Sequence, residues 1–310
     1  MAFQIYLANT RGMCAGVNRA IDVVRLALEK YGKDMVYVLH EVVHNRHVVE
    51  DLRQGGAHFV ESLDDIPDGK IVIFSAHGVS QAVIQRSGAR GFRVIDATCP
   101  LVKRIHHKMQ KASKSGQECI VIGHRGHQEV IGTIGQYTGD PQLVHVVENE
   151  GDVMKLKVRT ERLMFATQTT LSVDETAKTV AALRGRFAGI EGPKKDDTCF
   201  ATQLRQNAIK DLARRCDLVL VIGSKNSSNS NRLAEVARHE GCDAYLIDDE
   251  SYLDKAWLEG RESIGISAGA SAPEHIVQDL IACLKGLGGR DEVICVGDEE
   301  RDIVFPLPEI

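Results

Sequence analysis

The feature that most constrains this chain is a cysteine that stands three times at the same kind of joint, between a short apolar run and a helix-like stretch. Cys99 follows the apolar run 92–95 in Asp96-Ala97-Thr98-Cys99-Pro100, Cys199 ends the similar motif Asp196-Asp197-Thr198-Cys199, and Cys14 ends Arg11-Gly12-Met13-Cys14 after the run 5–8. The positive end of a helix dipole favours the thiolate, which is the form of cysteine that binds metal. Because the joint recurs, we predict that Cys14, Cys99 and Cys199 are metal ligands that leave one position open for substrate.

The same order of elements follows each of these cysteines: a helix, a buried-type strand that ends in a polar loop, and a later strand that ends in a second polar loop. A first strand is expected to end within 7–10, and further strands are expected at 35–39, 57–60, 71–75, 92–95, 119–122, 143–147, 163–166, 218–222, 244–247, 264–267 and 293–296. Strands that alternate with helices predict parallel α/β sheets. The predicted fold class is therefore α/β, with three similar domains at 1–98, 99–198 and 199–285 arranged pseudo-threefold around one centre, and a C-terminal strand and tail at 286–310.

The spacing between each cysteine and its polar loops is nearly constant. The first loop lies 30, 28 and 28 residues after the cysteine, at His44, His127 and Ser227. The second loop lies 63, 70 and 72 residues after it, at His77, Thr169 and Ser271. Ligands of parallel α/β sheets bind beyond the carboxyl ends of the strands. Three such domains facing one another are expected to bring the three cysteines and six polar loops to one centre.

The loops carry side chains suited to acid–base chemistry and to anion binding. A single histidine at a strand end is usually a loop histidine without a function, but His44 and His77 fall in one domain and His127 follows in the next. Glu129, two residues after His127, either caps a helix or donates a proton beside a desolvated site. The run 224–231 and Ser271 each precede a helix, so their hydroxyls and backbone amides are expected to bind phosphate.

Composition excludes several classes of protein. With 43% hydrophobic and 26% charged residues and a net charge of −5, the chain is typical of a soluble globular protein without the basic surplus of a nucleic-acid binder. No apolar run approaches the roughly 20 residues of a membrane helix and no secretory signal pattern is found, so we expect a cytoplasmic protein without a membrane partner. A disulfide framework is not expected in that compartment, and the other five cysteines are predicted to be fillers of the core: Cys119, Cys216, Cys242, Cys283 and Cys295.

The motifs together resemble a known family. The chain is similar to the 4-hydroxy-3-methylbut-2-enyl diphosphate reductases, the LytB-type family that performs the last step of the non-mevalonate (MEP) isoprenoid route. The resemblance runs through nearly the whole chain and rests on the stretches 11–17, 40–45, 74–78, 96–100, 168–172, 223–231 and 268–273, in that order. One departure is Gln128, where the family usually has proline between the histidine and the glutamate.

The resemblance implies a cofactor, a site and a reaction. The family holds a 4Fe–4S cluster on three cysteines, which here are Cys14, Cys99 and Cys199, at the centre of three α/β domains. Its substrate binds through residues that match His44, His77, His127, Thr169, Ser227, Ser228, Asn229 and Ser271. Glu129, acting near Thr169, is implied as the acid that lets the hydroxyl leave as water. Two electrons from a donor such as ferredoxin or flavodoxin then give isopentenyl or dimethylallyl diphosphate.

Three alternatives remain open at this point. One is another three-cysteine 4Fe–4S enzyme, such as a hydro-lyase or a quinolinate synthase, which needs no net reduction. The second is a non-catalytic iron–sulfur sensor, against which the net charge of −5 and the number of polar loops count. The third is a zinc enzyme with three thiolates and a water. Dependence on an external electron donor and acid-labile sulfide separate these from the reductase.

Overall fold

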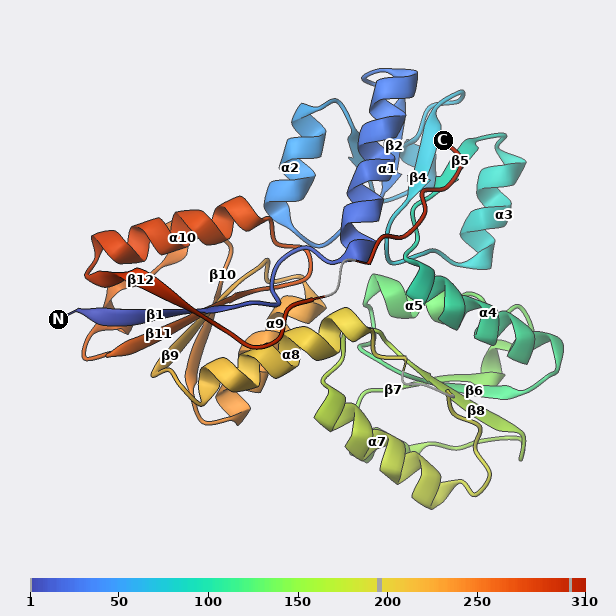
Figure 1. Ribbon diagram of the computed structural model, residues 1–310. Helices are drawn as coiled ribbons and strands as arrows, with labels where there is room; N and C mark the ends of the chain where they lie inside the picture. The colour runs from blue at the N-terminus through green and yellow to red at the C-terminus, as the bar shows by residue number, and fades with distance from the viewer. Residues whose placement is uncertain (1, 194–196, 301–302) are drawn as a thin grey trace. The chain divides into compact units, whose positions relative to one another are not determined.

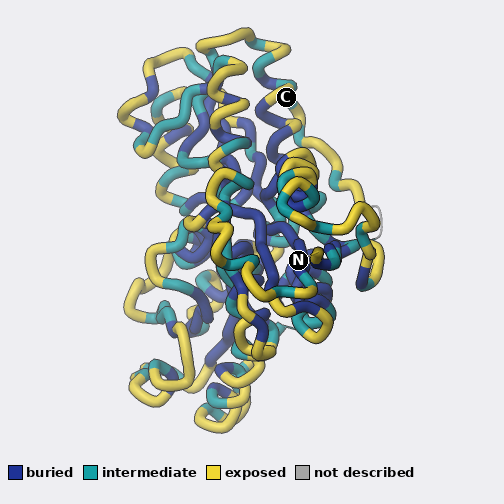
Figure 2. Tube along the Cα trace, turned by 90° about the vertical axis from the view of Figure 1, so that its left-hand side faces the viewer, coloured by how far each residue is buried: buried dark blue, intermediate teal, exposed yellow. Residues whose placement is uncertain are grey.

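The computed structural model describes residues 2–193, 197–300 and 303–310 (Figure 1). The chain divides into two compact units, each described here by itself. The first unit comprises Met1–Asn18, His44–Asp51 and Phe200–Val304, and the second comprises Arg19–Val43, Leu52–Cys199 and Phe305–Ile310. In both, buried residues follow the strands and exposed residues lie on the outer helix turns and loops (Figure 2).

The first unit is built on a parallel sheet with the strand order β10-β9-β11-β1-β12. Its strands are β1 (Phe3–Ala8), β9 (Leu218–Ile222), β10 (Asp243–Ile247), β11 (Ser263–Ala268) and β12 (Gly289–Val296), and its helices are α8 (Phe200–Ala213), α9 (Ser228–His239) and α10 (Glu274–Gly286). Leu218, Leu220 and Ile222 pack with α10 on one face, whereas Val219 and Val221 pack with α8 and α9 on the other. Both faces of β9 are therefore buried, which explains its unbroken apolar sequence.

The second unit holds two parallel sheets, with the orders β3-β2-β4-β5 and β7-β6-β8. The strands are β2 (Val36–Leu39), β3 (His58–Val60), β4 (Ile71–Phe74), β5 (Arg93–Asp96), β6 (Glu118–Ile122), β7 (Val144–Val147) and β8 (Leu163–Thr167). The helices are α3 (Gln81–Ala89), α4 (Pro100–Lys114), α5 (Gln128–Ile134), α6 (Glu150–Lys155) and α7 (Val173–Arg186), while α1 (Ala15–Tyr31) and α2 (Arg46–Gln54) contribute residues to both units.

Successive side chains of β6 point to opposite faces of the β7-β6-β8 sheet, and both faces are buried. Cys119 and Val121 join the core formed with α4, whereas Ile120 and Ile122 join the core that contains Leu183 of α7. Short 3-10 helices complete the described chain at Leu63–Asp65, Pro141–Leu143, Glu250–Tyr252 and Lys255–Leu258. Among the described residues, no helix has the length and apolar character needed to cross a membrane.

The predicted fold class, α/β with several parallel sheets, is confirmed. The structure adds one strand pairing that the sequence pattern did not predict: β1 pairs with β11 and with β12. The N-terminal strand therefore belongs to the sheet of the C-terminal third of the chain. The domain boundaries at 98, 198 and 285, and the arrangement of three domains around one centre, stay predictions.

Candidate metal centre and substrate site

Each of the three predicted ligand cysteines lies partly exposed at the start of a helix. Cys99 is the N-cap of α4, and Cys14 and Cys199 directly precede α1 and α8. The backbone amide of each cysteine donates a hydrogen bond to a carbonyl in the loop at the end of a strand of its own unit. These bonds run from Cys14 to Ala270 (3.1 Å), from Cys99 to Ala76 (3.0 Å) and from Cys199 to Thr169 (3.1 Å). The repetition seen in the sequence is thus a repetition of backbone geometry.

The other cysteines differ in environment from these three. Burial raises the pKa of Cys119 and of Cys216 to about 12, and burial also raises the pKa of Cys242, so these thiols are poor ligands. Cys283 is partly exposed and Cys295 is exposed on β12. The prediction that Cys295 fills the core is therefore wrong, because its side of the last strand is not covered.

The donor set fits an iron–sulfur cluster in its chemistry, since soft thiolates at helix starts are the usual ligands of such clusters. Cys14 belongs to the first unit, and Cys99 and Cys199 belong to the second. Within the described ranges there is no group of three His, Cys, Asp or Glu side chains placed to hold a metal ion. The joint action of the three cysteines therefore stays a prediction. Asp196 of the third cysteine motif lies outside the described residues.

Glu129 is a buried carboxylate, 3% exposed, held by one threonine. Its Oε1 accepts the backbone amide of Thr169 at 2.6 Å, and its Oε2 accepts the Thr169 hydroxyl at 2.9 Å. The carbonyl of Thr169 accepts the amide of Cys199. Thr169 therefore connects the buried carboxylate to the turn at Cys199 through hydrogen bonds.

Two of the predicted histidines lie together in the second unit. The rings of His77 and His127 contact edge to face, with 5.8 Å between their centroids. His127 caps α5, because its Nδ1 accepts the Glu129 amide at 3.1 Å. Its backbone angles, φ −70° and ψ 136°, are those that commonly precede a proline, so the turn keeps the geometry expected for the family although Gln128 stands at the proline position.

The predicted phosphate loop of the first unit forms the start of α9. This helix begins at Ser228, inside the run 224–231 that was expected to precede it, and Ser227 is its N-cap, accepting the Ser230 amide at 3.3 Å. Asn229 is 4% exposed, and its Oδ1 accepts the Ala270 amide at 2.8 Å. Its Nδ2 is buried, and no acceptor among the described residues bonds to it. A buried donor that lacks a partner suits an anionic ligand, because leaving it unpaired costs free energy.

The remaining two loop residues also meet within the first unit. The hydroxyl of Ser271 donates to the carbonyl of His44 at 2.9 Å. Next to this contact, the Arg46 amide donates to the Ser224 hydroxyl at 3.1 Å. The turn before α2 is thereby fixed to the loops that follow β9 and β11, at the carboxyl ends of the strands.

The predicted site residues are divided between the two units. The second unit holds Cys99, Cys199, His77, His127, Glu129 and Thr169, and the first unit holds Cys14, His44, Ser227, Ser228, Asn229 and Ser271.

Sequence reasoning missed a set of cations that hold the turns before the cysteines. Fully buried Arg205 donates from Nη2 to the carbonyl of Gly12 at 2.7 Å, two residues before Cys14. Arg19 donates to the carbonyls of Ala97 and Thr98, at 3.1 and 3.2 Å. These two carbonyls directly precede Cys99.

A third cation site stands before Cys199. The carboxylate of Asp197 is fully buried and pairs with Lys108, while Arg104 lies 3.7 Å away. Arg19, Arg104 and Arg205 lie five, five and six residues after Cys14, Cys99 and Cys199. The recurrence of an arginine five or six residues after each cysteine is the sequence signal from which these buried cations could have been predicted.

Comparison with known proteins identifies the relatives of this chain. The model of the LytB protein family matches residues 5–285. A relative from Marinobacter nauticus, named 4-hydroxy-3-methylbut-2-enyl diphosphate reductase, is 56% identical, with 99% of this chain and 97% of the relative covered. The solved structure of the E-1-hydroxy-2-methyl-but-2-enyl-4-diphosphate reductase from Plasmodium falciparum superposes with a TM-score of 0.93 at 36% identity, covering 99% of this chain and 96% of that one. A second solved reductase, described as the terminal enzyme of the non-mevalonate pathway, gives a TM-score of 0.64 at 30% identity and covers 92% and 100% of the two chains.

Proposed function

Because this chain belongs to the LytB protein family, we propose that it removes the 4-hydroxyl of 4-hydroxy-3-methylbut-2-enyl diphosphate reductively, as the terminal enzyme of the MEP isoprenoid pathway. The substrate takes up two electrons and two protons. Its carbon–oxygen bond breaks, a carbon–hydrogen bond forms, and the hydroxyl leaves as water. The products are isopentenyl and dimethylallyl diphosphate, according to which end of the allyl group takes the proton.

The observation that carries the chemical part of this proposal is the Glu129–Thr169 pair. Hydroxide is a poor leaving group, so its departure needs a proton from a positioned acid. Glu129 is buried, and Thr169 holds both of its oxygens. Burial excludes water from the acid, and the threonine fixes its direction. Glu129 is therefore the acid in this proposal and Thr169 is the residue that positions it.

Cys14, Cys99 and Cys199 are the proposed ligands of a 4Fe–4S cluster. When bound, the cluster would supply the electrons and a Lewis-acidic iron with an open position for the hydroxyl oxygen.

Diphosphate binding is assigned to the polar loops. Asn229, whose Nδ2 has no acceptor among the described residues, and the hydroxyls of Ser227, Ser228 and Ser271 offer neutral donors. His44, His77 and His127 add imidazole donors. In a closed site, fixed dipoles of this kind act strongly on an anion because the local dielectric is low. The proposed compartment is the cytoplasm, where a disulfide framework is not expected.

The test is anaerobic turnover of reconstituted protein with a reduced viologen and 4-hydroxy-3-methylbut-2-enyl diphosphate. We expect viologen oxidation with the appearance of five-carbon diphosphates, and loss of both with Cys99→Ser. Cluster-loaded protein that leaves viologen and substrate unchanged would overturn the proposal. The hydro-lyase and sensor alternatives would then be tested next.

A further inference from the structure

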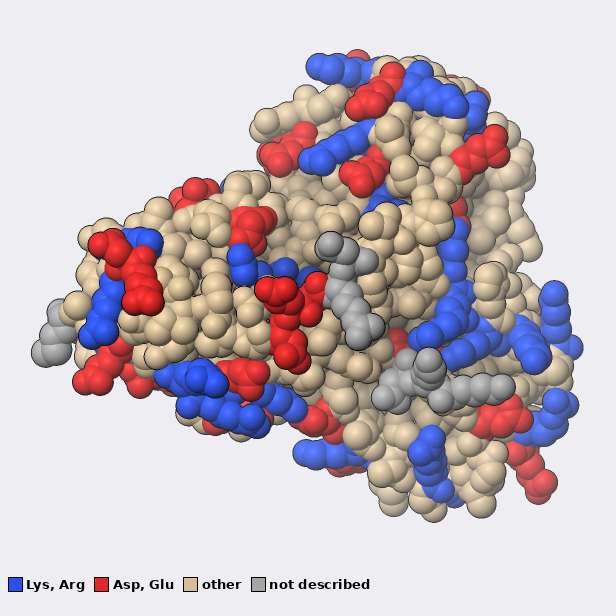
Figure 3. Space-filling model, in the orientation of Figure 1, with Lys and Arg blue, Asp and Glu red and all other residues tan. Residues whose placement is uncertain are grey.

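Helix α4 carries a concentration of positive charge that the reaction described above does not explain. Over Pro100–Lys114 it contains five Lys or Arg residues and no Asp or Glu, in a chain whose net charge is −5. Figure 3 shows these side chains gathered on the surface over α4. Charge so unlike that of the whole chain indicates a surface that meets an anionic partner.

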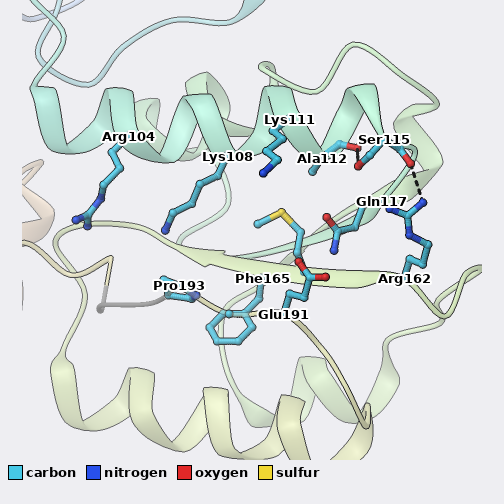
Figure 4. Close-up of a pocket in the computed structure, with 12 residues that line it drawn as sticks. Arg104, Lys108, Lys111, Ala112, Ser115, Gln117, Arg162, Phe165, Glu191 and Pro193 are labelled. Atoms are coloured by element: carbon cyan, nitrogen blue, oxygen red, sulfur yellow. Dashed lines mark hydrogen bonds between the residues drawn. The ribbon is translucent and has the colours of Figure 1, made fainter.

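A groove of about 720 Å³ runs along this helix, between α4 and the edge strand β8. Arg104, Lys108 and Lys111 extend from α4 into it, and Arg162 stands at its far end (Figure 4). The three residues of α4 share one face because they are spaced four and three apart. Phe165 of β8 also lines the groove but is only 2% exposed, so the surface that the groove offers to a partner is mainly the row of cations.

The positive charge of the groove is only partly neutralised. Arg104 and Lys108 share the one carboxylate of Asp197. Arg162 donates to the carbonyl of Ser115, and no described carboxylate forms an ion pair with Lys111 or Arg162. Counting Glu191, which also lines the groove, four described cations stand against two described carboxylates.

One end of the groove begins next to two of the proposed ligand cysteines. Arg104 stands five residues after Cys99 in α4, a rise of about 7.5 Å along the helix axis. Asp197, which Arg104 and Lys108 contact, stands two residues before Cys199, at most about 7 Å along the chain. A partner seated in the groove is thus close to both thiol joints of the second unit.

We propose that this groove docks an acidic one-electron donor protein, which delivers in two encounters the two electrons that each substrate consumes. This inference rests on the proposed function, because only a reductase needs such a donor. The charges argue for an acidic protein as the occupant. A negatively charged partner is repelled by the chain as a whole and attracted only where cations gather, so the groove both steers and orients it.

The test compares two double variants with the same net charge, using cluster-loaded protein and a plant-type ferredoxin as the probe. The double variant Lys111→Glu/Arg162→Glu reverses the charge of two groove residues. Neither residue belongs to the proposed active site, and neither contacts Asp197. Lys155→Glu/Lys178→Glu makes the same change on α6 and α7, where both lysines are exposed and neither lines the groove. Binding of oxidised ferredoxin is titrated at low and high salt, and turnover is measured with reduced ferredoxin and with reduced viologen.

We expect the groove variant to raise the Kd and the KM for ferredoxin about tenfold or more at low salt, and viologen-driven turnover to stay within twofold of the wild type. Reduced viologen is a radical monocation, so it gains nothing from a basic groove. The control variant should match the wild type in every measurement. An unchanged Kd in the groove variant, or an equal loss in the control variant, would overturn the docking proposal. Absence of viologen-driven turnover in the wild type would instead overturn the proposed function.

Discussion

At the scale of single residues, the most informative side chain is Glu129. Its two oxygens accept the amide and the hydroxyl of Thr169, so an isosteric amide can keep the amide bond through its own oxygen while losing the acidic proton. We expect Glu129→Gln to retain iron, labile sulfide and substrate binding, and to lower kcat about 100-fold or more.

A matched control separates chemistry from geometry at this position. Thr169→Val keeps the acid but removes the hydroxyl that holds Oε2, so a smaller loss of kcat is expected there. Near-normal turnover of Glu129→Gln would remove Glu129 as the proton donor.

The buried side chain of His106 is expected to make the free energy of unfolding depend on pH. Burial lowers its pKa to about 4; Asp96 opposes this effect, and the nearby positive charges of His107 and Lys103 add to it. Its Nε2 has no partner among the described residues, and its ring packs against Gly78, where a Cβ would lie 2.4 Å from Cε1.

The folded-state pKa of His106 lies below the unfolded value of 6.5, so the unfolded chain binds the proton first as the pH falls. The contribution to stability is complete above pH 6.5 and decreases toward pH 4. Between pH 6.5 and pH 5 we expect a loss of about 2 kcal/mol in the free energy of unfolding, measured by urea denaturation. His106→Leu should remove this dependence and His107→Gln should keep it. An unchanged pH slope in His106→Leu would contradict the assignment.

At the scale of elements, the helices after the cysteines hold the turns before other cysteines. Arg205 of α8 is buried and bonds the Gly12 carbonyl and Glu300. Replacing it with methionine leaves the buried Gly12 carbonyl without this donor and breaks an ion pair with the partly exposed Glu300, which together cost about 3 kcal/mol. We therefore expect Arg205→Met to lower both Tm and the iron bound per chain.

The matched control for Arg205 lies just beyond the same helix. Arg214 is 64% exposed and makes only long ion pairs at 3.6 and 3.9 Å, so Arg214→Met should leave both quantities unchanged. Full iron content in Arg205→Met, together with a lowered Tm, would show that the arginine stabilises the fold without positioning the Cys14 turn.

At the scale of the whole molecule, the proposed metal group joins parts of the chain that are far apart in sequence. Cys14 and Cys99 are 85 residues apart, and Cys99 and Cys199 are 100 apart. A group bound only in the folded state stabilises that state, and ties between distant residues do so most. We expect removal of iron by a chelator under reducing conditions to lower the calorimetric Tm of the wild type. An equal Tm with and without iron would contradict this role for the three cysteines.

The sequence by itself determined the features that depend on local pattern. Apolar runs of four or five residues predicted the strands, and the repeated cysteine joint predicted three equivalent turns, which the backbone amide hydrogen bonds of Cys14, Cys99 and Cys199 confirm. These features follow from the backbone preferences and burial of neighbouring residues, so the order of residues contains them.

Only the tertiary structure decided which distant segments meet. The pairing of β1 with β11, the contact of Arg205 with Gly12 and the hydrogen bond from the Ala270 amide to Asn229 each join residues that are separated by long stretches of chain. The same is true of the basic groove, which combines residues of α4 with Arg162. Long-range strand pairing depends on how whole faces of sheets and helices pack, and a local sequence pattern does not contain that information. In the same way, the sequence does not distinguish a buried arginine from an exposed one.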